Sequence, residues 1–134
     1  MPADRLKVRD IGGGYEVLDG ADDLGRCGSI AEAAQFVRER GARLWLDWGR
    51  TVIGGQTAPH DFSASFLGSD SVGRILGEKY GPSAGTWAWS ISTHDSRWRK
   101  HGGQRGREAT KEAAVAELER EFTNYLADPV KKPV

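Results

Sequence analysis

The chain has 134 residues and no formal net charge at neutral pH, because 19 Lys and Arg residues balance 19 Asp and Glu residues. Hydrophobic residues make up 38% of the chain and charged residues 28%, which is typical of a folded domain and excludes a disordered, highly charged segment. Zero net charge also excludes a whole-molecule attraction to nucleic acid or anionic membrane, so such binding would need a local basic patch.

The first third of the chain predicts short strands followed by one helix. Apolar residues alternate over residues 6–11 and 15–18, and Gly25-Arg26-Cys27 could be a third short strand. Ser29-Ile30-Ala31-Glu32 matches a capping box, in which the Ser hydroxyl and the Glu carboxylate each accept a free backbone N–H of the first turn. Gly41 is a natural residue to end the helix that starts there.

The middle of the chain predicts a strand, a hairpin and a linker. Residues 43–48 alternate in character, with two Leu and Trp48 on one face and Trp45 on the other. A tight hairpin then leads to residues 51–53, and residues 54–60 are expected to be a linker. If the Trp45 face is exposed, Trp45 marks a protein interface, because an exposed Trp is typical of binding surfaces.

The last half predicts three strands and a second helix. Residues 62–66 and 72–76 alternate between apolar and polar or small residues. The most regular alternation is over residues 87–91, where every second residue is Trp or Ile. Residues 110–127 have an apolar stripe at helical spacing, with Thr110 as the expected N-cap, and this helix is expected to cover the aromatic face of the Trp-bearing strand.

These elements predict an α+β fold, with antiparallel β-sheets and two packed helices. Its length predicts a single domain, residues 1–134, which could contain two sub-units, residues 1–57 and 58–134. The two halves resemble each other around the helix caps: Gly25-Arg26 precedes Ser29, and Gly106-Arg107 precedes Thr110. Duplication of a ββα unit would explain this match, and so would the common need of such segments for a Gly turn and a cap.

A basic segment between the Trp-bearing strand and the second helix is the most distinctive chemical feature. It holds cationic residues and one Trp with no acidic residue, so it could bind phosphates and stack a base. The candidate nucleic-acid-binding residues are Arg97, Trp98, Arg99, Lys100, Arg105 and Arg107. Two alternatives remain open: a solvated loop whose charge is offset by the Glu-rich helix that follows, and a site for an anionic protein partner.

Catalytic and metal-binding patterns are weak in this sequence. The His60-Asp61 and His94-Asp95 pairs lack the spacing of metal ligands, so we expect no metal and no cofactor. Arg26 and the start of a helix flank Cys27 and could lower its pKa, but without a His partner a buried thiol is the favoured interpretation. We therefore expect a protein that is not an enzyme.

The second half resembles a pattern found in short uncharacterised proteins that are common in alphaproteobacteria and their phages. The residues that carry the resemblance are Val72-Gly73-Arg74-Ile75, Gly81-Pro82, Gly85-Thr86-Trp87-Ala88-Trp89 and Thr110-Lys111-Glu112-Ala113-Ala114. The resemblance implies a strand, a Gly-Pro loop, a Trp-x-Trp strand and a capped Ala-rich helix, with no known activity. It also raises the expectation of an accessory protein of a mobile element.

These observations predict a small non-catalytic binding module, with DNA or RNA as the expected partner. The alternative is a protein-interaction module or an inhibitor from a mobile element, which could be a homodimer. A single Cys excludes an intramolecular disulfide, no stretch approaches the roughly 18 apolar residues of a membrane span, and the first residues lack an apolar signal core. We therefore expect a cytoplasmic protein that does not contact a membrane.

Overall fold

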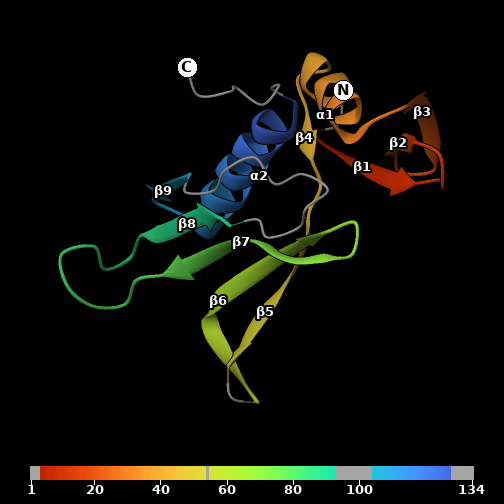
Figure 1. The fold of residues 1–134 in the computed structure, drawn as a ribbon. Coiled ribbons are helices and arrows are strands. Elements are labelled where there is room, and N and C mark those ends of the chain that lie inside the picture. Colours follow the sequence, from red (N-terminus) through yellow and green to blue (C-terminus); the bar gives the residue numbers. More distant parts are fainter. Residues whose placement is uncertain (1–3, 54, 93–103, 128–134) are drawn as a thin grey trace, which may run out of the picture. The chain divides into compact units, whose positions relative to one another are not determined.

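The computed structural model describes residues 4–53, 55–92 and 104–127. The chain divides into two compact units, the first made of residues 1–45 and 119–134 and the second of residues 46–118. The predicted α+β class is confirmed, because the described residues form a four-stranded sheet, a five-stranded sheet and two helices (Figure 1). Neither of these helices is long and apolar enough to cross a membrane.

The first unit is built on the four-stranded sheet, whose strand order is β3-β2-β1-β4. Neighbouring strands are antiparallel except β1 and β4, which are parallel because helix α1 connects β3 to β4 and returns the chain in the direction of β1. The elements are β1 (Arg5–Asp10), β2 (Tyr15–Asp19), β3 (Asp22–Cys27), α1 (Ile30–Glu39) and β4 (Arg43–Leu44).

Helix α1 begins as the sequence predicts, with one difference in its cap. Ser29 Oγ accepts the backbone N–H of Glu32 at 3.1 Å, as the capping box requires. The Glu32 carboxylate, however, accepts the N–H of Gly28 at 3.1 Å and not that of Ser29. Gly41 ends the helix in the left-handed region, at φ +72°. The buried side chains of α1 face the sheet of its unit: Ala33, Ala34 and Val37.

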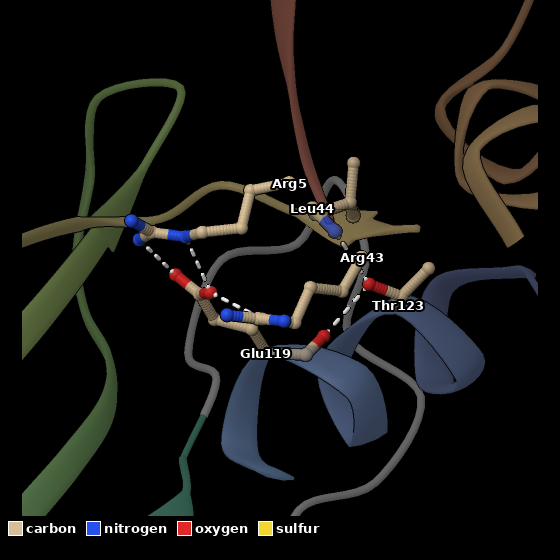
Figure 2. A network of polar contacts seen from close by, with 5 residues as sticks. All are labelled: Arg5, Arg43, Leu44, Glu119 and Thr123. Atoms are coloured by element: carbon tan, nitrogen blue, oxygen red, sulfur yellow. Dashed lines mark hydrogen bonds and ion pairs between the residues drawn. The ribbon is translucent and has the colours of Figure 1, made fainter. Parts of the chain in front are cut away.

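The second half of helix α2 (Lys111–Ala127) completes the first unit through a buried carboxylate (Figure 2). The side chain of Glu119 is 0% exposed and lies between two guanidinium groups. Arg5 donates to both carboxylate oxygens at 2.8 and 2.6 Å, and Arg43 Nε donates at 2.9 Å. Beside this pair, Thr123 Oγ1 accepts the N–H of Leu44 at 2.8 Å. These bonds hold β1 and β4 to the helix.

The second unit is a meander of five antiparallel strands followed by the first half of α2 (Figure 1). Each strand pairs with the next one in the chain, so β5 and β9 are the two edges of the sheet. The strands are β5 (Asp47–Ile53), β6 (Gln56–Phe66), β7 (Ser69–Gly77), β8 (Trp87–Ile91) and β9 (Arg105–Glu108).

Three predictions for the middle of the chain are wrong in detail. The tight hairpin expected before residues 51–53 does not form, because β5 runs without a break from Asp47 to Ile53. Residues 54–60, expected as a linker, belong largely to the β5–β6 hairpin, in which Val52 pairs with Thr57. Pro59 is tolerated because β6 pairs with β7 only from Asp61 onward, so this end of β6 has a single neighbour. A division between residues 57 and 58 would fall inside β6. The expected strand 43–48 is also divided, between β4 and β5 of different sheets.

One face of the five-stranded sheet is covered by the first half of α2. A single row of cross-strand partners runs through all five strands on this face: Arg50, Phe62, Ile75, Trp89 and Gly106. Helix residue Leu118 packs against Gly73, where a Cβ atom would lie 2.8 Å from Leu118 Cδ2. The first half of α2 therefore contacts β7 on the face of the sheet that also carries Trp89. The predicted cover of the Trp-bearing strand itself stays a prediction.

Candidate functional site

The other face of the five-stranded sheet carries polar and basic side chains. Because paired residues on adjacent strands point to the same side, the strand register defines two rows on this face. The first row runs Gly49, Ser63, Arg74, Ser90 and Arg105. The second row runs Asp61, Leu76, Ala88 and Arg107. Three arginines therefore point to the same side of β7 and β9.

Arg74 is fixed by a buried carboxylate in the middle of this face. Its Nε donates to Asp61 Oδ1 at 2.8 Å and its Nη2 donates to Asp61 Oδ2, while Thr51 Oγ1 donates to Asp61 Oδ1 at 2.7 Å. The Arg74 guanidinium holds the pKa of Asp61 below its ordinary value of 3.8, although burial opposes this effect. The Asp61 side chain is 3% exposed and that of Arg74 is 51% exposed. Arg74 thus keeps donors directed to solvent.

The two arginines of β9 differ in how strongly they are held. Arg107 Nη1 donates to Thr86 Oγ1 at 2.9 Å and lies 3.7 Å from Glu78 Oε1, with both charged side chains partly exposed. Such an exposed pair contributes little to stability, so solvent or a ligand can replace it. Arg105 is exposed, and its side chain has no hydrogen bond or ion pair in the part of the chain that the structure describes.

These side chains border a shallow hollow of about 450 Å³, which we call the arginine hollow. Leu76, an apolar residue that is 38% exposed, and Ser90 lie between the arginines of β7 and β9. Guanidinium groups around a polar and partly apolar surface are suited to bind phosphate or carboxylate groups. The arginine hollow is lined by Arg74, Leu76, Ala88, Trp89, Ser90, Arg105, Gly106 and Arg107.

Only part of this surface is predicted from the sequence. Arg105 and Arg107 were predicted, and the structure brings them together with Arg74, which was missed. The signal for Arg74 was present in the sequence, since it alternates with the core residue Ile75 and so must lie on the opposite face. Four predicted residues, Arg97, Trp98, Arg99 and Lys100, lie outside the described residues. In the sequence they fall between β8 and β9.

Trp45, the candidate interface residue, belongs to the first unit and is 41% exposed. Its neighbours Leu44 and Leu46 are buried, which identifies the Trp45 side as the exposed one. Arg5 Cζ lies 4.3 Å and Lys7 Nζ 5.0 Å from the centroid of its ring. The indole therefore forms part of a cationic surface, where its ring is in contact with two positive charges.

The weaker candidates that lie within the described residues have separate neighbours. The His60 ring lies against Trp87, with ring centroids 6.3 Å apart, whereas Asp61 bonds to Arg74. Burial, and secondly Glu32, raises the pKa of the Cys27 thiol above its ordinary value of 9.0, which is opposite to the lowering weighed as the less favoured interpretation. Within residues 4–53, 55–92 and 104–127, no three His, Cys, Asp or Glu side chains form a metal-binding group. His94, Asp95 and His101 lie outside these residues.

Comparison with known proteins finds no matching family model, no similar curated protein and no similar solved structure.

Proposed function

We propose that this protein is a small non-catalytic binding module that binds the phosphate backbone of nucleic acid through the arginine hollow. The proposal is supported by the position of three arginines. Arg74, Arg105 and Arg107 lie on the same face of the five-stranded sheet and line one hollow. Arginine recognises phosphate oxygens through paired N–H donors, and a sheet surface offers room for an extended backbone.

A basic hollow close to a predicted stacking residue is typical of sites for a single strand rather than for a duplex. Single-stranded chains lie along basic grooves and stack their bases on aromatic side chains. The segment between β8 and β9 adds Arg97, Arg99 and Lys100 as predicted phosphate ligands and Trp98 as the predicted stacking residue. Because the whole chain has zero net charge, the attraction would be local and would weaken steeply with salt.

Fluorescence anisotropy with labelled single- and double-stranded DNA and RNA across a salt series tests this proposal. We expect Arg105→Gln to weaken single-strand binding about fivefold and to lower the slope of log affinity against log salt by roughly 0.7 for the lost phosphate contact. The matched control is Arg26→Gln, which removes the same charge from a 70% exposed side chain of β3 in the first unit.

A triple Ala variant at Arg97, Arg99 and Lys100 tests the part of the prediction that concerns the segment between β8 and β9. We expect it to weaken binding further than Arg105→Gln alone, since it removes three positive charges. Absence of binding at low salt, or an equal effect of Arg26→Gln, would reject the nucleic-acid proposal.

We also propose that the protein is located in the cytoplasm.

The second candidate function, a protein-interaction module or mobile-element inhibitor that could self-associate, is supported by the exposure of Trp45. Exposed Trp residues with adjacent cations are typical of interface centres. Sedimentation velocity of the wild type and Trp45→Ala over a concentration series tests self-association. An assembly that is insensitive to salt and is lost in Trp45→Ala would favour this function over the first.

A further inference from the structure

A second hollow, of about 280 Å³, lies on the helix-covered face of the five-stranded sheet, beside the first residue of α2. We call it the Phe62 hollow. Because the arginine hollow lies on the face that the helix does not cover, the two hollows are on opposite sides of the sheet. Its walls combine apolar side chains of β5, β6, β7 and α2 with two cations: Trp48, Phe62, Ile75, Val115, Arg50 and Lys111.

Both cations lie over the ring of Phe62. Lys111 Nζ lies 3.8 Å and Arg50 Cζ 5.7 Å from the centroid of Phe62. Cross-strand pairing explains the position of Arg50, which is the register partner of Phe62 on β5. The ring attracts each cation but carries no net charge, so it cannot neutralise either of them.

Neither cation has an anionic partner in the part of the chain that the structure describes. Arg50 and Lys111 have no ion pair and no side-chain hydrogen bond there. In contrast, Arg5, Arg43 and Arg74 each bond to a carboxylate. Two cations that share one aromatic ring beside an apolar wall repel each other, and a bound anion would relieve this repulsion.

We propose that the Phe62 hollow binds a small organic anion, namely a carboxylate attached to one aromatic ring or a short alkyl group. Its carboxylate would accept hydrogen bonds from Arg50 and Lys111, and its apolar part would pack against Phe62 and Ile75. The volume of the hollow is below the roughly 300–1,000 Å³ of sites for drug-sized ligands, so the ligand has a single ring or its equivalent.

NMR titration of the full chain, labelled with ¹⁵N, tests this site with three probes. Phenylacetate carries both the ring and the charge, phenylacetamide has the ring without the charge, and acetate has the charge without the ring. We expect saturable shifts of the amides of Arg50, Phe62 and Lys111 with phenylacetate. The two partial probes should bind at least about tenfold more weakly, since each lacks one half of the recognition.

Variants separate this site from the rest of the molecule. Lys111→Gln and Arg50→Gln should each weaken phenylacetate binding about tenfold, with the remaining amide spectrum unchanged. Lys79→Gln, at an exposed lysine outside the hollow, should leave it unaltered. Arg105→Gln should also leave it unaltered, so the result does not depend on nucleic-acid binding. Absence of saturable shifts, equal binding of phenylacetamide, or full binding by both Gln variants would overturn the proposal.

Discussion

The carboxylate of Glu119 is buried away from water. Arg5 and Arg43 supply its counter-charge within the first unit. In a Glu119→Gln variant the shape is kept, but Arg5 and Arg43 lose their counter-charge. We expect the free energy of unfolding to fall by about 2–4 kcal/mol, below the largest effects of broken buried pairs because both arginines keep some solvent contact. Urea unfolding followed by circular dichroism measures this change.

The matched control for that variant is Glu121→Gln, on the same helix. Glu121 is partly exposed and has no ion pair among the described residues, so its replacement should alter stability by less than about 0.5 kcal/mol. If the two variants were equally stable, the ion pairs of Glu119 would only offset the cost of removing its charge from water, with no net gain in the free energy of unfolding.

Asp61 predicts a stability loss in acid. Its pKa in the folded state is below the ordinary 3.8, chiefly because Arg74 donates hydrogen bonds to it. Its contribution to stability is therefore complete above pH 3.8 and disappears as the pH falls through the lowered pKa. Thermal unfolding should show Asp61→Asn less stable than the wild type at neutral pH, with the difference shrinking below pH 3.8. A difference that stays constant in acid would contradict this assignment.

The indole of Trp89 packs directly against Gly106 of strand β9, which is possible only because glycine has no side chain. A Cβ atom at position 106 would lie 2.6 Å from the ring, which is also held by its hydrogen bond to Glu108. Gly106→Ala should therefore lower the free energy of unfolding by about 1–3 kcal/mol, as overpacking in a core does. Differential scanning calorimetry measures the effect.

Gly49 on β5 provides the comparison in the same sheet. A Cβ atom there meets nothing within 4 Å, so Gly49→Ala should be neutral, or stabilising by up to about 1 kcal/mol through the unfolded state. If both Ala variants had the same melting temperature, the close contact at Trp89 would not constrain the choice of residue at position 106.

Most elements were predictable because their signals are local. Residues 87–91 alternate strictly, and the hydroxyl groups of Ser29 and Thr110 accept the expected backbone N–H groups. The break within residues 43–48 was not predictable, because alternation of apolar residues continues through the point where the chain leaves one sheet for another. The β5–β6 hairpin was missed because the interpretation gave more weight to Gly and Pro59 than to the neighbouring β-branched residues.

The candidate site was only half predictable for a related reason. Alternation indicates that Arg74 and Ile75 lie on opposite faces, but strand order alone tells which strands stand beside β7. The grouping of Arg74 with Arg105 and Arg107 therefore required the structure. The Phe62 hollow was not predicted at all, since its two cations, Arg50 and Lys111, are separated by four strands in the sequence.

The first unit is made of two separate segments of the chain, and this predicts which fragments of the protein fold on their own. Residues 1–45 contain its four strands and α1 but lack Glu119 and Thr123, which bond to β1 and β4. Such a short segment has a small core, so we expect the isolated fragment 1–45 to be unfolded. Fragment 46–127 retains all five strands of the other sheet and all of α2, and we expect it to fold.

Amide dispersion in proton NMR spectra distinguishes these outcomes. The full chain serves as the folded reference and the full chain in urea as the unfolded one. A well-dispersed spectrum of fragment 1–45 would show that the first unit does not require the second half of α2.

The position of Glu119 also has a consequence for the order of events during synthesis. The ribosome makes Arg43 76 residues before the carboxylate that neutralises it. At about 5–20 residues per second, this interval lasts roughly 4–15 s, much longer than hairpins or helices need to form. Strands β1–β4 are therefore made several seconds before the second half of α2, and all strands of the later meander are synthesised within that interval. Early-made segments would thus finish folding last, and chaperones would meet the first unit in its incomplete form.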